Sequence, residues 1–207
     1  MRIPCLVVLA LVIVTACNKP SEPEPAAPAP QPAAQAPALT QDKPAPATGS
    51  AGTPSAGGLT WTASKPLTPR TPKSSMRAAE YGVEGDPQSE LTVFYFGADQ
   101  GGGVEANIQR WVSQFKQADG SEAVAKRGER SVKDITISTV ETTGSFGGGM
   151  APPGAPPPAA INDALLLGAI AKGPQGSVFF KLVGPRASVE SARSAFDQLL
   201  ESLHKAE

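Results

Sequence analysis

The order of apolar and polar residues predicts five strands in the C-terminal part of the chain. Arg77–Val83 and Ile135–Thr143 alternate in side-chain character, and the second is rich in β-branched residues, as in half-buried strands. Leu91–Phe96 is apolar on both faces, which predicts a central strand covered on both sides. Ala164–Ala171 and Ser177–Gly184 are two apolar strands whose short Gly-Pro-containing connection predicts a hairpin.

Two further segments have the spacing of amphipathic helices. Val104–Lys116 repeats its apolar residues at intervals of four, three and four, and Ser188–His204 shows a similar stripe. Ser188 is the predicted N-cap of the second helix. The stripes consist of Val104, Ile108, Trp111 and Phe115 in the first helix and of Val189, Ala192, Phe196, Leu199 and Leu203 in the second.

These seven elements follow one another in the order β-β-α-β-β-β-α. Strands joined by short turns must be antiparallel, and two amphipathic helices need a sheet to cover. We therefore predict an α+β layered domain with a mainly antiparallel sheet of about five strands and two packing helices.

The end of the chain combines a hydrophobic strand, a glycine and a helix that closes with Phe, Leu and Ser. This pattern resembles the end of Mog1/PsbP-like domains, and residues 76–207 also resemble a group of uncharacterised bacterial lipoproteins. The resemblance implies a Mog1/PsbP-like layered domain, a fold whose members serve as binding or assembly factors; fold alone does not specify function. The residues that carry it are Val178–Pro185, Phe196, Leu199, Leu200, Ser202, Leu203 and the helix segment Asn107–Trp111.

An uncharged apolar run lies at the N-terminus, from Cys5 to Ala16, behind the basic residue Arg2. Its length of about a dozen residues is below the roughly 20 of a spanning helix and within the roughly 7–15 of a signal-peptide core. The residues Val14-Thr15-Ala16-Cys17 resemble the lipobox of bacterial lipoproteins. The resemblance implies removal of residues 1–16 and lipid on Cys17. The alternatives are an uncleaved anchor helix and a signal in which Cys17 has no role.

Lipid on Cys17 predicts firm attachment to a membrane. One acyl chain holds a protein only marginally, and the lipoprotein cysteine, by resemblance, carries a diacylglyceryl group and often a third chain. Asn18, rather than Asp, follows the cysteine. In proteobacterial lipoprotein sorting this implies the outer membrane, facing the periplasm, rather than the inner membrane.

Residues 17–58 are dominated by Pro and Ala, with Gly and Ser toward the end. Such a segment has almost nothing to bury, so we expect a disordered, partly polyproline tether. A ligand for a proline-recognising partner is the alternative. The composition changes at Leu59 and Trp61, and residues 59–207 suffice for a single domain.

The charge of the chain and its few cysteine and histidine residues argue against nucleic-acid binding, a disulfide, a metal site and catalysis. The formal net charge of -1 leaves no basic footprint for nucleic acid. Cys5 lies in the predicted signal, so the mature chain would keep only Cys17, without a disulfide or a thiolate site. The single histidine, His204, has no companion for a zinc site, and Asp134 and Asp163 are isolated. We expect no cofactor, no metal and no catalysis.

Three residues are candidates for contact with a partner. Arg110 lies on the first helix, where its stem could equally cover apolar surface. Phe146 and Met150 lie in a Gly- and Pro-rich loop, residues 145–158, which also fits a plain flexible connection. The leading expectation is a lipid-anchored, non-catalytic binding or assembly protein of the cell envelope with an unknown protein partner. A carrier of small apolar ligands and a peripheral envelope enzyme are the alternatives.

Overall fold

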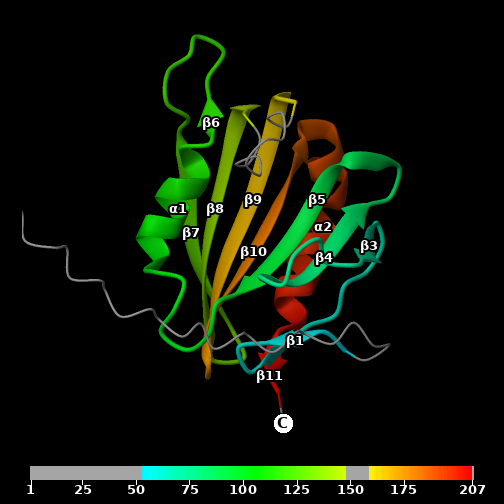
Figure 1. Ribbon diagram of the computed structural model, residues 1–207, viewed down its shortest axis with the longest axis vertical. Helices are drawn as coiled ribbons and strands as arrows, with labels where there is room; N and C mark the ends of the chain where they lie inside the picture. The colour runs from blue at the N-terminus through cyan, green and yellow to red at the C-terminus, as the bar shows by residue number, and fades with distance from the viewer. Residues whose placement is uncertain (1–52, 148–158, 207) are drawn as a thin grey trace, which may run out of the picture. The chain divides into compact units, whose positions relative to one another are not determined.

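The chain is described by a computed structural model, which covers residues 53–147 and 159–206. These residues form two antiparallel sheets and two helices (Figure 1). The larger sheet has the strand order β3-β4-β5-β10-β9-β8-β6, and β7 also pairs with β8. Its strands are β3 (Leu67–Arg70), β4 (Arg77–Val83), β5 (Asp86–Tyr95), β6 (Phe115–Lys116), β7 (Ala125–Val132), β8 (Ile135–Phe146), β9 (Ile161–Gly173) and β10 (Gly176–Pro185).

The predicted antiparallel α+β architecture is confirmed, but the prediction of about five strands is wrong because the large sheet has eight. The five predicted strands are β4, β5, β8, β9 and β10, and the last two form the predicted hairpin. The overlooked strands lack an apolar alternation. Most residues of β7 are exposed because it is an edge strand that pairs only with β8, and β3 at the other edge contains Pro69.

The two predicted helices are α1 (Val104–Val112) and α2 (Arg186–Ser202). The predicted end of α1 at Lys116 is wrong. Phe115 and Lys116 leave the helix and pair with Phe146 and Ser145 at the end of β8. The spacing of Phe115 continues the helical stripe, so the sequence pattern alone does not mark this exit.

Both predicted ends of α2 are also displaced. The helix begins at Arg186, and its N-cap, Pro185, lies three residues before the predicted cap Ser188. It ends at Ser202, and His204 belongs to a short strand instead. Proline at a helix boundary fits, since its fixed φ suits the start of a helix and its missing N–H is not needed there.

Each face of the large sheet carries one helix and an apolar core beneath it. The face under α2 holds the larger core, in which Trp61 donates from Nε1 to the hydroxyl of Tyr81 at 2.9 Å and packs edge-on against Phe180. The face under α1 holds a second core around Trp111, Phe115 and their neighbours. β9 serves both faces, which is why all of its central residues are buried.

A small sheet joins the two ends of the domain. β2 (Leu59–Thr60) pairs with β1 (Ser55–Ala56) and with β11 (His204–Lys205), and Thr60 Oγ1 lies 2.7 Å from His204 Nε2. The folded domain thus includes Ser55 and Ala56, which fall inside the range expected for the tether. A two-residue strand is too short to show an alternating pattern.

Neither helix within residues 53–147 and 159–206 has the length and apolar character needed to cross a membrane.

Candidate functional site

The residues singled out from the sequence lie in different places. Cys17 and Met150 are outside the described residues. Phe146 is only 8% exposed, and its ring packs 5.1 Å from that of Phe115. The prediction of Phe146 as a surface contact in a flexible loop is wrong. β8 continues past Thr143 and, after a register shift at Gly144, brings this ring into the core.

Arg110 is exposed on α1, and its Nη1 donates to Asn107 Oδ1 at 3.0 Å. Asn107 is buried, and its Nδ2 donates to the carbonyl oxygens of Gly101 at 2.7 Å and Gly103 at 3.0 Å. Asn107 therefore ties the glycine turn to the start of α1. Arg110 is part of this arrangement and stays accessible.

The face of the large sheet that carries α1 is only partly covered by that helix. Trp111 packs on Gly168 of β9, and the other described helix, α2, lies on the opposite face. In Figure 1, α1 lies beside β7 and β8, whereas β10, β5 and β4 extend away from it. We call the part of this face formed by β10, β5 and β4 the open sheet face.

A polar row crosses the open sheet face. Glu80 of β4 pairs with Thr92 of β5, Thr92 with Lys181 of β10, and Lys181 with Gly168. Directly paired residues point to the same face of a sheet. A Cβ at Gly168 would lie 2.7 Å from the ring of Trp111, so this is the face of α1.

Four charged groups meet at one end of this row. Arg77 Nη1 donates to Glu80 Oε2 at 2.7 Å and to Glu90 Oε1 at 2.6 Å, and Lys73 Nζ contacts both carboxylates. The side chain of Glu80 is fully buried, and its Oε1 accepts no hydrogen bond from the described residues although Lys73 Nζ is 3.2 Å away. The four charges thus balance one another, with Glu80 buried and Lys73 largely exposed.

Glu90 is strongly stabilised in its charged form. Burial would raise the pKa of its carboxyl, but the hydrogen bond from Lys73 and the positive charges of Arg77 and Lys73 lower this pKa to about 2. The same contacts raise the pKa of Lys73, against the opposing effect of burial. Glu90 and Lys73 therefore stay ionised across the physiological pH range.

Lys181 is the fifth ionisable residue of the open sheet face and differs from the other four. Its Nζ donates to Gln114 Oε1 at 2.6 Å and lies 5.1 Å from the centre of the Phe146 ring. Within the described part of the chain it forms no ion pair. Burial lowers the pKa of its ammonium group to about 8, and the charge of Glu90 only partly opposes this effect.

Aromatic rings adjoin the charged groups. Phe94 of β5 pairs with Arg77 of β4 and with Phe179 of β10. Its ring stacks with that of Phe96 at 6.0 Å, and Phe96 in turn lies edge-on to Phe179 at 5.6 Å. Phe94 and Phe96 are half-buried, so the open sheet face offers both apolar area and charge.

The apolar pattern of the chain does not predict this site, but the sequence holds one signal of it. Lys181 interrupts the otherwise apolar strand predicted at Ser177–Gly184, whereas Glu80 fits the alternation of its predicted strand and gives no such signal. Lys and Glu are almost never fully buried unless they are paired. A lysine inside a strand predicted to be apolar is therefore a signal for a candidate site.

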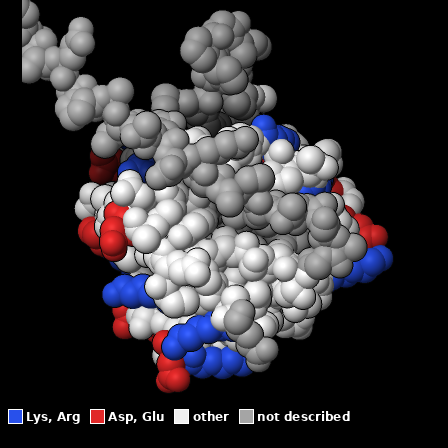
Figure 2. Space-filling model, turned by 60° about the horizontal axis from the view of Figure 1, so that its bottom comes forward, with Lys and Arg blue, Asp and Glu red and all other residues white. Residues whose placement is uncertain are grey.

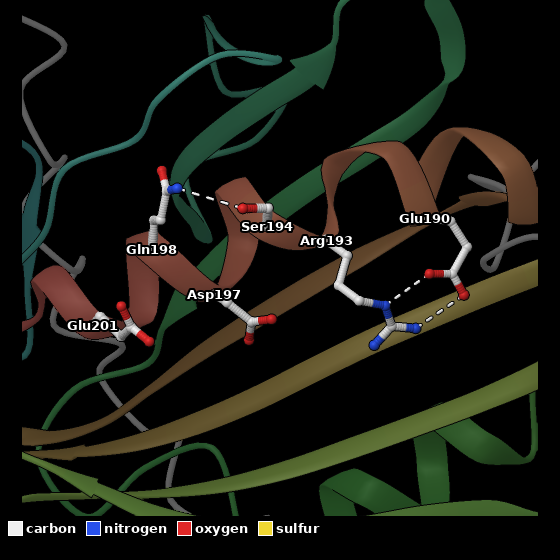
Figure 3. A pocket seen from close by; sticks show the side chains of 6 residues that line it. All are labelled: Glu190, Arg193, Ser194, Asp197, Gln198 and Glu201. Carbon is white, nitrogen blue, oxygen red and sulfur yellow. Dashed lines mark hydrogen bonds and ion pairs between the residues drawn. The ribbon is translucent and has the colours of Figure 1, made fainter.

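The surface hollows lie elsewhere. Side chains of α2 alone line an open hollow of about 530 Å³ (Figure 3). Arg193 crosses its floor, with Nε 2.7 Å from Glu190 Oε2 and Nη1 3.0 Å from Glu141 Oε2. The lining residues are Glu190, Arg193, Ser194, Asp197, Gln198 and Glu201. Since one helix surface forms this hollow and its arginine is already paired with carboxylates, it is a weak candidate for a ligand site.

A second hollow of about 240 Å³ separates α2 from β7 and β8. Two ion pairs bridge it, Arg130 to Asp197 at 3.2 Å and Arg193 to Glu141 at 3.0 Å. These pairs hold the helix against the edge of the sheet. We assign the groove a structural role for this reason.

Charges of both signs are interspersed on the face seen in Figure 2.

Across residues 53–147 and 159–206, no three His, Cys, Asp or Glu side chains are grouped so that they could hold a metal ion. The absence of a nucleic-acid partner stays a prediction.

Comparison with known proteins gives limited information. No family model matches the chain, and no curated protein matches it either. Among solved structures, the chain is similar to the solution structure of cyanobacterial PsbP (CyanoP) from Synechocystis sp. PCC 6803. The sequence identity is 12% and the TM-score 0.46, over 72% of this chain and 87% of that chain. Assignment of the domain to the Mog1/PsbP-like group stays a prediction.

Proposed function

We propose that this protein is a lipid-anchored, non-catalytic binding module of the cell envelope and that it contacts its partner through the open sheet face. The observation that supports this proposal is the grouping of five ionisable side chains beside half-buried aromatic rings on that face. The ionisable residues are Lys73, Arg77, Glu80, Glu90 and Lys181.

Packing alone does not call for such a group. Moving charges out of water costs free energy, and even a well-paired buried ion pair often adds little stability compared with apolar residues of similar size. Five charged residues on one side of a sheet whose other side is apolar therefore favour a role in recognition. Aromatic residues and Arg, which are enriched at interfaces, are present here as Phe94, Phe96 and Arg77.

The anchor part of the proposal rests on Cys17. Lipid there would hold the domain at a membrane, with the outer membrane facing the periplasm as the proposed site. Cys17→Ala should release the protein into the soluble fraction or stall its processing, whereas Cys5→Ala should leave it anchored. Fractionation and mass spectrometry of the native protein measure this. An acylated, membrane-bound Cys17→Ala protein would contradict the proposal.

The two alternatives receive unequal support. A carrier of small apolar ligands needs an enclosed apolar cavity, and the two hollows described above are open and lined by charged side chains. The single observation that favours an enzyme is the lowered pKa of Lys181. That residue contacts an amide and an aromatic ring, neither of which is a general acid or base.

Crosslinking in cells tests the binding face. A photoreactive phenylalanine at Phe94 of the full-length protein should yield a discrete crosslinked product with another envelope protein. The same group at Gln198, exposed on α2 and on the opposite face, should not. Equal products at both positions, or none at Phe94, would argue against the open sheet face as the contact surface.

A further inference from the structure

We propose that Lys181 binds a carboxylate of the partner, carried by an acidic and aromatic peptide segment that lies on the open sheet face. This inference rests on the proposed function and specifies its chemistry. It concerns a residue that lies at the boundary between the half of the sheet covered by α1 and the half formed by β10, β5 and β4.

Lys181 has N–H donors without an acceptor among the described residues. An ammonium group has three N–H donors. In the described residues one acceptor is present, Gln114 Oε1 at 2.6 Å, and one side of the group faces the ring of Phe146. Lys73 and Arg77 differ in this respect, because both are already paired with Glu80 and Glu90. Lys181 is therefore the cation of this face that an incoming anion can pair with at no cost to an existing ion pair.

The charges of the open sheet face favour a ligand with a single negative charge. Glu90 acts on Lys181 electrostatically, and so does Arg77. Lys73 and Arg77 already balance the charges of Glu80 and Glu90. Among the described residues this leaves the single positive charge of Lys181 to be matched, which a singly charged carboxylate does and a doubly charged phosphate exceeds. A charge-assisted hydrogen bond from a lysine to one carboxylate suits this setting.

The rings near Lys181 favour an aromatic residue next to the carboxylate of the ligand. Phe94 lies two residues beyond Thr92 on β5, and Thr92 is the cross-strand neighbour of Lys181. Residues i and i+2 of a strand point to the same face. A peptide residue next to the bound carboxylate would thus meet the half-buried rings of Phe94 and Phe96, where an aromatic side chain can stack.

The experiment compares three capped tetrapeptides that differ at one position. They are acetyl-Ala-Glu-Phe-Ala-amide, its Gln counterpart and its phosphoserine counterpart, titrated into the full chain without its signal. Backbone amide shifts of Thr92 and Val183 report binding, and the side-chain carbon shifts of Lys181 report its pKa. The Glu peptide should bind at least about tenfold more tightly than the other two and should raise the pKa of Lys181.

Two variants complete the test. Lys181→Gln should weaken the Glu peptide about tenfold and leave the Gln peptide unchanged, whereas the control Lys172→Gln should change neither. The inference is overturned if the Glu and Gln peptides bind alike, if the phosphoserine peptide binds as tightly as the Glu peptide, or if no peptide binds. The comparison of peptides on the unaltered protein does not depend on the folding of any variant.

Crosslinking separates this inference from the function on which it rests. If the product at Phe94 forms in cells and persists in the Lys181→Gln protein, the open sheet face binds a partner but Lys181 does not hold it. If the product is absent from the unaltered protein, the binding face itself is wrong.

Discussion

The indole ring of Trp111 packs directly on the backbone of Gly168. A Cβ atom at Gly168 would lie 2.7 Å from Trp111 Cζ3 and 2.7 Å from a methyl group of Val140. This contact seats α1 on the sheet and brings Gln114, just beyond the helix, to the ammonium group of Lys181. The position of α1 on the sheet therefore determines which side chain contacts Lys181 at the edge of the open sheet face.

Gly168→Ala should destabilise the domain. The added methyl group has no room, because an aromatic ring and a β-branched side chain lie on either side of it, and such overpacking costs about 1–3 kcal/mol. Urea unfolding followed by tryptophan fluorescence measures the loss. Gly147→Ala is the matched control, because a Cβ there meets nothing within 4 Å. Equal stability of the two variants would show that the Trp111 contact is looser than described.

Lys181 should make stability depend on pH in the alkaline range. Its pKa is lowered from 10.5 to about 8 in the folded protein, so between these values the unfolded chain binds more protons. Stability contributed by this group is therefore lost as pH falls through 8 and regained as pH rises toward 10.5.

Replacement of this residue by an apolar side chain should remove the effect. At pH 7, Lys181→Met should be more stable than the unaltered protein by on the order of 1–3 kcal/mol, and the difference should shrink as pH approaches 10.5. Unfolding by urea at several pH values measures it. The exposed residue Lys172, changed to Met, should show a difference that does not vary with pH. A constant difference for Lys181→Met as well would count against the role of burial.

Glu90 should govern stability in acid. Its pKa is lowered from 4.5 to about 2, so its contribution is complete above pH 4.5 and is lost as pH falls toward 2. Glu90→Gln should cost about 2 kcal/mol at pH 7 and should flatten the acid loss of stability. The exposed control Glu129→Gln should retain the full acid dependence. An unchanged acid profile in Glu90→Gln would mean that other carboxyl groups dominate it.

Asn107→Ala should weaken the start of α1. The change removes two hydrogen bonds from a buried amide to the carbonyl groups of Gly101 and Gly103, at a cost of about 1–2 kcal/mol. Thermal unfolding provides the measurement. Gln109→Ala, an exposed position on the same helix, serves as the control and should change stability by less than about 0.5 kcal/mol. A loss of similar size in both variants would point to helix propensity instead.

The apolar pattern predicted the central elements because each of them buries a face of its own. The predicted bounds Arg77–Val83 are those of β4, and the bounds of β8, β9 and β10 differ from prediction by at most three residues. β5 begins five residues before the predicted start at Leu91. The antiparallel pairing of β4 with β5 and of β9 with β10 follows from their short connections. The proposed lipid anchor also comes from sequence alone, since the residues around Cys17 need no fold to be recognised.

Other features depend on partners that are distant in sequence. β7 is stabilised by hydrogen bonds to β8, not by apolar residues of its own. Phe146 is buried because β8 carries it against Phe115. The open sheet face exists only where β4, β5 and β10 lie next to one another, which places Lys181 near Glu90 and Arg77.

The sequence by itself determined which segments must bury apolar surface and which end is suited to carry lipid. Only the tertiary structure decided where each strand ends, which aromatic residues are hidden and which charges meet. The physical reason is that hydrophobic periodicity is a local property, whereas strand pairing and ion pairing are made between residues far apart along the chain.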